Sequence, residues 1–205
     1  MSISSAPRRR RRAPEEARRE AVASARALLM KGGPDAVTLK SVADDIGVTH
    51  TNLIHHFGSA AGLQSALMAS MVADLSRALD AAIVRLRTDE GAPLEVVNAV
   101  FDAFAEGGAG RLAAWIVLSG DLSQLDPVRN AVIGLVEAIR EKLHATEDDA
   151  RERIGPAVLF IALSAFGEAL IGPPLRDMLG QDDDASRSVV AGLLPAFLLK
   201  PGHHS

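Results

Sequence analysis

The chain has 205 residues, 48% of them hydrophobic, so it can bury one good-sized domain or a small domain joined to a larger one. It contains no cysteine, which excludes disulfides and thiolate metal sites and fits a reducing cytoplasm. Charge is uneven: residues 1–60 hold ten Lys/Arg and six Asp/Glu, whereas residues 61–205 hold twelve and twenty, so the front of the chain is expected to meet a polyanion.

The N-terminal segment, residues 1–13, is expected to be a disordered basic arm because Arg8 to Arg12 are five consecutive arginines. Two interpretations of this run stay open at this point, a solvated tail and an arm that binds DNA. Pro14 suits the first position of a helix, which is predicted to end at the Gly-Gly-Pro sequence of residues 32–34. This helix is polar, so no signal peptide is predicted.

Residues 39–57 predict two short helices joined by a tight turn. Thr38 and Thr49 are placed to cap them, because a threonine hydroxyl can accept hydrogen bonds from the first backbone amides of a helix. Ala43 is small enough for a close helix crossing, and Gly47 can adopt the positive φ that the turn requires. The pattern predicts a helix-turn-helix, with an ordinary helical hairpin as the weaker alternative.

The remainder of the chain is also predicted to be helical. Ser59 is placed to cap a long helix with leucines and methionines at helical spacing. The Gly-Pro-Pro sequence of residues 172–174 is predicted to end the penultimate helix at Ile171. No apolar run approaches about 18 uninterrupted residues, so we predict no membrane span and no membrane partner. These later helices are expected at about 60–87, 93–107, 111–119, 126–144, 146–171 and 185–199.

Residues 14–63 resemble the DNA-binding domain of the TetR family of transcriptional regulators, through the stretch VTLKSVADDIGVTHTNLIHHFGSAAGL. The resemblance implies an all-α fold, in which a three-helix DNA-binding domain is joined by a long helix to a helical ligand-binding and dimerisation bundle. In this chain the arm would cover residues 1–13, the DNA-binding domain 14–59 and the ligand-binding domain 60–205. Only the first third carries matching motifs, and the rest matches in length and helix count.

The sequence departs from that family at two positions expected to touch the DNA backbone. Ile54 stands where the family usually has a tyrosine that touches a phosphate, and Ala60 stands where it usually has a lysine. Neither side chain can make those contacts. We therefore expect other groups to supply the lost affinity, with the arginine run and one of His55 and His56 as candidates.

Three histidines, His50, His55 and His56, crowd the second short helix. Paired metal ligands on a helix share a face at a spacing of four, whereas these are one, five and six apart, and no acidic residue lies between positions 46 and 73. A catalytic base would need an orienting partner and a cleft, which this segment does not supply. A helical metal-dependent enzyme using the three histidines is thus the least favoured alternative, and no cofactor or metal is predicted.

The start of this helix is instead predicted to read DNA. The first residues of a recognition helix enter the major groove, and here they are short and polar. Asparagine can pair with adenine through two hydrogen bonds, and threonine offers a methyl group to thymine. For His56, a phosphate contact and a half-buried structural ring are equally open. The predicted DNA-contacting residues are Arg11, Arg12, Thr38, Lys40, Thr49, His50, Thr51, Asn52, His55 and His56.

The C-terminal part is predicted to dimerise and to enclose a ligand. In families of this layout the last two helices pair with their copies as a four-helix bundle, here at about 157–171 and 185–199. The predicted dimer interface comprises Leu159, Leu163, Phe166, Leu194, Phe197 and Leu198. The residues predicted as candidates to line a cavity are Phe101, Phe104, Trp115, Ile116, Leu118 and Phe160, although residues of this kind are more often plain core than pocket.

Taken together, these features predict a homodimeric, non-enzymatic, cytoplasmic DNA-binding regulator. We expect a repressor that a small, largely apolar inducer releases from double-stranded operator DNA. The inducer would favour a spacing of the two recognition helices that no longer fits successive major grooves, and the long helix from Ala60 would transmit the change. A nucleoid or interaction protein with the same front and no inducer is the main alternative.

Overall fold

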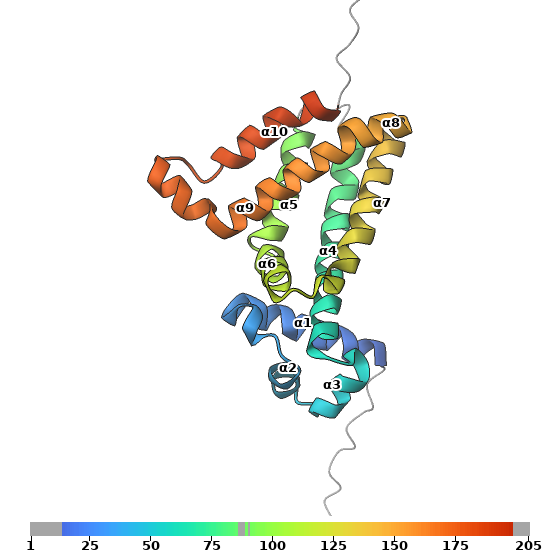
Figure 1. Ribbon diagram of the computed structural model, residues 1–205, viewed down its shortest axis with the longest axis vertical. Coiled ribbons are helices and arrows are strands. Elements are labelled where there is room, and N and C mark those ends of the chain that lie inside the picture. Colours follow the sequence, from blue (N-terminus) through green and yellow to red (C-terminus); the bar gives the residue numbers. More distant parts are fainter. Residues whose placement is uncertain (1–13, 86–88, 90, 199–205) are drawn as a thin grey trace, which may run out of the picture.

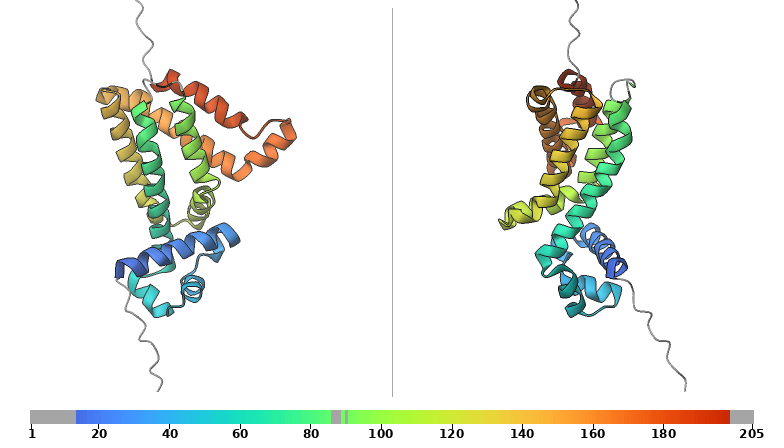
Figure 2. Two further views of the ribbon diagram at one scale, coloured as in Figure 1. Left: turned by 180° about the vertical axis from the view of Figure 1, so that it is seen from behind. Right: turned by 90° about the vertical axis from the view of Figure 1, so that its right-hand side faces the viewer.

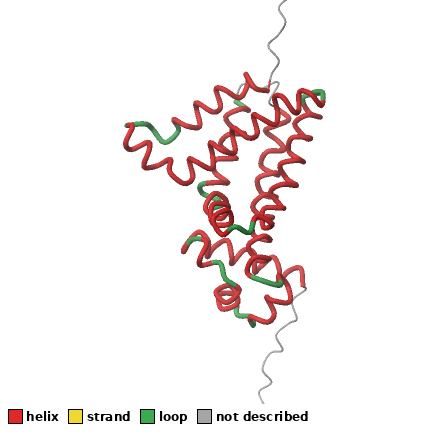
Figure 3. Tube along the Cα trace, viewed as in Figure 1, coloured by secondary structure: helices red, strands yellow, loops and turns green. Residues whose placement is uncertain are grey.

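A computed structural model describes residues 14–85, 89 and 91–198, and all regular structure in those residues is helical (Figure 3). The all-α prediction is therefore confirmed. The predicted basic arm, including Arg11 and Arg12, lies outside the described residues.

Three helices form a small domain at one end of the molecule: α1 (Pro14–Gly32), α2 (Leu39–Ile46) and α3 (His50–Phe57) (Figure 1). A short 3-10 turn, η1 (Pro34–Ala36), joins the first two. Thr38 Oγ1 accepts a hydrogen bond from the Ser41 amide at 3.0 Å, and Thr49 Oγ1 accepts one from the Asn52 amide at 3.2 Å. Gly47 has φ 66°, a conformation that favours glycine. The local sequence signals thus produce the predicted helix-turn-helix.

The small domain has its own core. Ala43 is buried at the crossing of α2 and α3, as its size predicts. Leu53 and Phe57 anchor α3 from beneath, with 1% and 8% of their surfaces exposed. The buried cluster continues into α4 through Leu63, Leu67, Met68 and Met71.

A long helix, α4 (Ala60–Arg85), leaves the small domain and runs through the larger one (Figure 1). Ser59 caps it, since its Oγ accepts a hydrogen bond from the Gly62 amide at 3.1 Å. Figure 2 shows α5 and α7 running beside α4, and α9 crossing this layer toward α10. The remaining elements are α5 (Ala92–Phe104), α6 (Ala109–Ser119), η2 (Leu122–Leu125), α7 (Asp126–Lys142), α8 (Glu147–Asp149), a π-helical turn η3 (Ala150–Ile154), α9 (Gly155–Leu179) and α10 (Ala185–Leu198).

The end of α9 corrects one prediction, because the helix does not stop at Ile171. It continues through Pro173 and Pro174 to Leu179, and it bends at its far end in Figure 1. Each proline removes one backbone hydrogen bond, but its φ suits a helix. This stretch lies at the surface, where water can bond the freed carbonyls. An ion pair between Arg176 and Glu168 also ties the two sides of the bend together.

Within the described residues, one helical run, from Glu147 to Leu179, is long and apolar enough to cross a membrane by length and composition. A single such helix is weak evidence, because core helices of soluble proteins pass the same test. In this protein, however, only 22% of its most apolar 18-residue window is buried. Most residues of that window are therefore half-buried or exposed in the protomer.

Candidate nucleic-acid interface and ligand cavity

The outer face of α3 is polar and open. Thr49, His50, Thr51 and Asn52 are all exposed at the start of the helix, whereas Leu53, the next residue, is buried. Thr49 is partly committed to capping, so its methyl group is the part left for other contacts. The structure thus places together the four residues predicted to enter a major groove.

The C-terminal end of α3 is braced by a residue that sequence reasoning missed. Arg18 of α1 donates a hydrogen bond from Nη1 to the His56 carbonyl at 2.7 Å, and its guanidinium carbon lies 4.7 Å from the centroid of the Phe57 ring. The cation and the ring attract each other, and the hydrogen bond satisfies a carbonyl at a helix end. No local sequence signal distinguishes this arginine from the others as the one that would pair with α3.

The other predicted contact residues differ in how free they are. Lys40 and His55 are exposed, whereas His56 is half-buried, with its ring centroid 6.4 Å from that of Phe57. The half-buried ring agrees with the structural interpretation of His56, and its role at DNA stays a prediction. Thr38 is exposed, but its hydroxyl is engaged by Ser41 in a capping box, so it has less freedom to reach a phosphate.

Both departures from the family pattern are exposed residues. Ile54 is 43% exposed on α3, and Ala60 is exposed at the start of α4. Neither offers a hydrogen bond. Among the described residues, no group of three or more His, Cys, Asp or Glu side chains is placed to hold a metal ion. The exposed face of α3 offers polar and apolar contacts, and Lys40 on α2 is an exposed positive charge of the same small domain.

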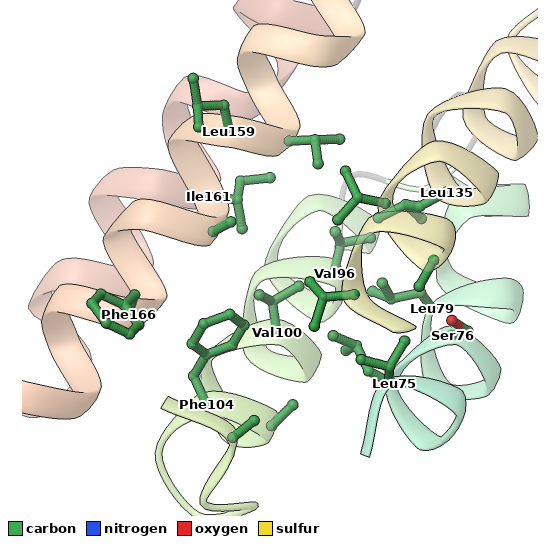
Figure 4. A pocket seen from close by; sticks show the side chains of 18 of the residues that line it. Leu75, Ser76, Leu79, Val96, Val100, Phe104, Leu135, Leu159, Ile161 and Phe166 are labelled. Atoms are coloured by element: carbon green, nitrogen blue, oxygen red, sulfur yellow. The ribbon is translucent and has the colours of Figure 1, made fainter. Parts of the chain in front are cut away.

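A cavity of about 320 Å³ lies in the larger domain, between α4, α5, α7 and α9 (Figure 4). Of its 27 lining residues, all but Ser76 are apolar. A pocket of this kind holds apolar ligands, because a buried charge or an unpaired polar group would find no partner in it. Its walls include Leu75, Leu79, Val96, Val100, Phe104, Leu135, Leu159, Ile161 and Phe166.

Of the six residues predicted to line a cavity, Phe104 alone lines this one. Phe101 and Ile116 are fully buried in the packed cores instead. Trp115 faces the small domain, and Leu118 is 87% exposed. The ring of Phe160 packs on that of Phe197, with centroids 5.8 Å apart. Aromatic type alone did not distinguish these environments, because helix orientation decides which face a residue occupies.

The floor of the cavity adjoins the core of the small domain. Met68 and Met71 line the cavity and also belong to the buried cluster that extends from α1, α2 and α3. Ala109 and Ala113 of α6 line the cavity and pack against the same cluster. A ligand resting on this floor would therefore touch side chains that also pack toward the helix-turn-helix.

Helix α6 contacts the small domain directly at two points. Trp115 Nε1 donates a hydrogen bond to Asp35 Oδ1 in η1 at 3.0 Å. At the start of α6, Gly108 has φ 77°, which favours glycine, and a Cβ there would lie 2.8 Å from the Met30 Sδ and 3.1 Å from the Leu29 Cδ2, so α6 approaches α1 closely. A shift of α6 would act on both contacts.

The residues predicted for a dimer interface occupy three environments. Leu159 and Leu163 are 59% and 61% exposed, as an interface requires, and Phe166 is half-buried. Leu194 is 1% exposed and belongs to the core of its own protomer, which corrects its placement at an interface. Its neighbour Leu193 is exposed instead, because one step along a helix turns the side chain by about 100°. Phe197 is half-buried against Phe160, and the side chain of Leu198 lies outside the described residues.

A helix-turn-helix with an open polar face, attached to a helical domain with an apolar cavity, defines a DNA-binding protein with an effector domain. The sequence model of "Bacterial regulatory proteins, tetR family" matches residues 21–67. A relative from Brucella canis, the HTH-type transcriptional regulator BetI, is 26% identical over 175 residues, 85% of this chain and 86% of that protein.

Solved structures of low sequence identity share the fold. A tetR-family regulator from Streptomyces coelicolor has a TM-score of 0.67 at 18% identity, covering 89% of this chain and 79% of that one. One from Pectobacterium atrosepticum has a TM-score of 0.63 at 23% identity, covering 94% and 100%. The multidrug binding protein EbrR, complexed with imidazole, has a TM-score of 0.65 at 15% identity, covering 93% and 99%.

Over residues 21–67 the chain matches the sequence model of the tetR family, and it is a DNA-binding transcriptional regulator. Members of that family bind DNA and ligands, act as dimers and are generally not enzymes. The matched residues lie within the stretch, residues 14–63, that carries the resemblance, apart from the last four.

Proposed function

We propose that this protein is a cytoplasmic repressor that binds double-stranded operator DNA as a homodimer and is released by a small, uncharged, apolar inducer. The observation that carries the inducer class is the lining of the cavity, which has no charged residue and a single polar one, Ser76. A charged group buried there would lose its hydration without gaining a partner.

In this proposal Thr51 and Asn52 contact base edges, with Thr49 and His50 beside them. Their exposure at the start of α3 supports this arrangement. Lys40 and His55 would contact phosphates, since both are exposed side chains of the small domain. Phosphate contacts would position the domain, and base contacts would provide its sequence preference.

The basic arm supplies further phosphate contacts in this proposal, through Arg11 and Arg12. Deleting residues 1–12 is expected to weaken DNA binding and flatten its salt dependence, because each lost phosphate contact removes about 0.9 from the log–log slope. The measurement is a titration of a fluorescent duplex at several salt concentrations. An unchanged slope would show that the run is only a solvated tail.

The inducer class is tested with two molecules of matched chain length, a neutral fatty alcohol and a quaternary ammonium compound. An operator duplex is first identified by genome-wide binding, and protein is then titrated against it with each compound. The alcohol is expected to weaken operator binding, and the ammonium compound is expected to have little effect. Equal effects, or an effect of the ammonium compound alone, would contradict an apolar inducer.

A filled cavity provides the matched variant. Ala162→Trp places a large ring among the lining residues, whereas Ala73→Trp places one on the exposed face of α4 outside the lining. The first is expected to abolish the response to the alcohol and the second to preserve it. A protein that binds its operator and never responds to any apolar compound would instead support the nucleoid or interaction protein without inducer.

Signal transmission is proposed to run from the cavity floor through α4 and α6. Met71 and Ala113 are shared between the lining and the core that extends from the small domain, so a ligand that displaces them also displaces that core. A change of a few degrees in α4 would alter the distance between the two α3 helices of a dimer. Two half-sites of DNA accept only one such distance.

A further inference from the structure

Met30 differs from the other methionines of the described residues, because its sulfur lies at a contact between two helices while its side chain is open to water. Met68 and Met71 are buried, with 2% and 4% of their surfaces exposed, whereas Met30 is 40% and Met178 is 78% exposed. The chain has no cysteine, so methionine carries all of its sulfur. Exposed methionine is oxidised reversibly to the sulfoxide, which turns a flexible apolar side chain into a polar one.

The Met30 side chain packs where the last turns of α1 meet the start of α6 (Figure 1). Its Sδ lies 2.8 Å from the position that a Cβ on Gly108 would take, and the Cδ2 of Leu29 lies 3.1 Å from the same position. Leu29 is fully buried in the cluster that forms the core of the small domain. The sulfur is therefore part of an apolar contact between the DNA-binding domain and the domain that holds the cavity.

We propose that Met30 is an oxidation site through which hydrogen peroxide weakens DNA binding, independently of any ligand in the cavity. The sulfide sulfur attacks one peroxide oxygen, and an S–O bond forms as the O–O bond breaks. The leaving hydroxide takes the proton of the transferred oxygen and departs as water, so the sulfur is oxidised to the sulfoxide and the peroxide is reduced. This site adds a second input to the DNA-binding function and does not depend on the proposed inducer.

A groove of about 410 Å³ gives peroxide a route to Met30. The groove lies between α1, α4, α5 and the turn before α6, and Met30 forms part of its wall. Three charged side chains, Arg26, Asp74 and Glu106, line the same groove. Charged walls favour water and small polar molecules, because they supply the hydrogen-bond partners that these molecules need. In this respect the groove differs from the apolar cavity.

An oxygen on the sulfur makes the contact with Gly108 unfavourable. The Leu29 side chain has no donor, and the Gly108 amide already donates to the Ala105 carbonyl at 3.4 Å, so a sulfoxide oxygen at this contact would stay without a partner. In the groove, Arg26 lies four residues before Met30, on the same face of α1, and its Nε has no hydrogen-bond partner within the described residues. The oxidised side chain is therefore expected to turn away from Gly108 into the groove.

The loss of this contact would act on the helix-turn-helix through α1. Helix α1 packs on α2 and α4, and its Arg18 holds the C-terminal end of α3 through the His56 carbonyl and the Phe57 ring. If α6 no longer packs on Met30, α1 and the recognition helix that it braces are free to shift relative to the larger domain. In a dimer, such a shift changes the distance between the two α3 helices, and two half-sites of DNA accept only one distance.

The first experiment compares operator binding before and after oxidation. The unaltered protein, Met30→Leu and the control Met178→Leu are treated with hydrogen peroxide in the presence of a metal chelator, and mass spectrometry of peptides locates each sulfoxide. The unaltered protein and Met178→Leu are expected to bind the operator about tenfold more weakly after treatment, the order of effect of a polar group that loses its place in an apolar contact. Met30→Leu is expected to bind equally well before and after treatment.

Reduction separates a reversible change at Met30 from general damage. Methionine sulfoxide reductases that act on both epimers should restore the lost affinity of the oxidised protein. A loss of affinity in Met30→Leu as large as that of the unaltered protein would overturn the proposal, since the sensitive group would lie elsewhere. Oxygen uptake at Met178 without uptake at Met30, or a sulfoxide at Met30 without a loss of affinity, would overturn it too.

The second experiment tests the contact itself without any oxidant. Met30→Gln places a polar amide at the end of the side chain in imitation of the sulfoxide, and Met178→Gln is its control. Trp115 is the single tryptophan of the chain and joins α6 to Asp35 of η1, so its fluorescence reports this junction. In Met30→Gln the emission is expected to shift to longer wavelength and operator binding to weaken, whereas Met178→Gln should change neither. Unchanged emission and unchanged operator affinity in Met30→Gln would overturn the proposal.

The two inputs can fail separately. If no apolar compound releases the protein from its operator but oxidation at Met30 does, the proposed inducer function fails while the oxidation site stands. If apolar compounds release the protein and peroxide acts equally on the unaltered protein and Met30→Leu, the inducer function stands and the oxidation site fails.

Discussion

Two helices of this protein, α3 and α9, each leave one face uncovered by the protomer, and the two faces differ in chemistry. The open face of α3 begins with Thr49, His50, Thr51 and Asn52 and is polar. The open face of α9 carries Leu159, Leu163 and Leu170 and is apolar. Short polar groups suit base edges and phosphates, whereas leucine rows suit another apolar surface.

The difference shows that exposure alone does not identify a functional surface. Both helices bury the opposite face through residues of the same type, Leu53 in α3 and Ile161 in α9. What separates them is the chemistry of the side chains that remain outside. A polar face has no need of cover in water, so its function must come from specific hydrogen bonds. An apolar face is stabilised by any contact that excludes water from it. The choice of its partner therefore depends mainly on a complementary shape.

The largest expected effect is a difference in stability between substitutions on the buried face and on the open face of α3. Leu53→Ala should lower the free energy of unfolding by about 2–5 kcal/mol, because it removes a fully buried side chain and leaves a cavity. Ile54→Ala, one residue further and 43% exposed, should cost less than about 1 kcal/mol. Urea denaturation at one fixed protein concentration measures both. Similar losses would mean that the two residues do not face opposite environments.

The next effect tests whether the polar face reads sequence. Asn52→Ala should weaken operator binding by about 1–3 kcal/mol if the amide makes a two-bond contact with a base. Binding to a random duplex should barely change, since phosphate contacts remain. Asn130→Ala, an exposed asparagine on α7, is the control. The measurement is a pair of titrations, with operator and with random duplex, at one salt concentration. Equal losses of affinity for both duplexes would assign Asn52 to a contact with the DNA backbone.

A smaller effect is expected when a positive charge is added at the start of α4, and it tests whether position 60 lies against a DNA phosphate. Ala60→Lys restores a cation at the start of α4 and should strengthen binding to operator and random DNA alike. The log–log salt slope should steepen by about 0.9 for one added phosphate contact. Ala73→Lys, exposed further along α4, should leave the slope unchanged. A slope that responds equally to both lysines would show a general charge effect and no contact at position 60.

The smallest effect concerns communication between the two ends of the molecule. Trp115→Phe keeps the ring but removes the hydrogen bond to Asp35, which is worth about 0.5–1.5 kcal/mol at most. Folding and operator binding should change little, while the factor by which an apolar inducer weakens operator binding should fall. Ser119→Ala removes a hydrogen bond within α6 itself and serves as control. A response that survives Trp115→Phe unchanged would exclude this contact from the coupling.

The helix-turn-helix was predictable from the amino-acid sequence because its signals are local. Thr38 and Thr49 cap helices within three residues of their bonding partners, and Gly47 fixes the turn through its own φ. The exposed polar residues at the start of α3 were predictable for the same reason. A cap marks where the helix begins, and the helical period then indicates which residues face outward. The same is true of the apolar row of α9 at Leu159 and Leu163, whose spacing is visible in the chain.

Which apolar residues enclose a cavity and which fill a core depends on how distant helices pack, and it could not be predicted from the sequence. Phe104 lines the cavity while Phe101, one turn earlier, is fully buried, and no local property of either phenylalanine distinguishes them. Their roles follow from where α4, α7 and α9 cross α5, and such long-range placement has no short sequence signal. The course of α9 past Pro173 was decided in the same way. Surface exposure and the Arg176–Glu168 ion pair outweighed the local tendency of proline to end a helix.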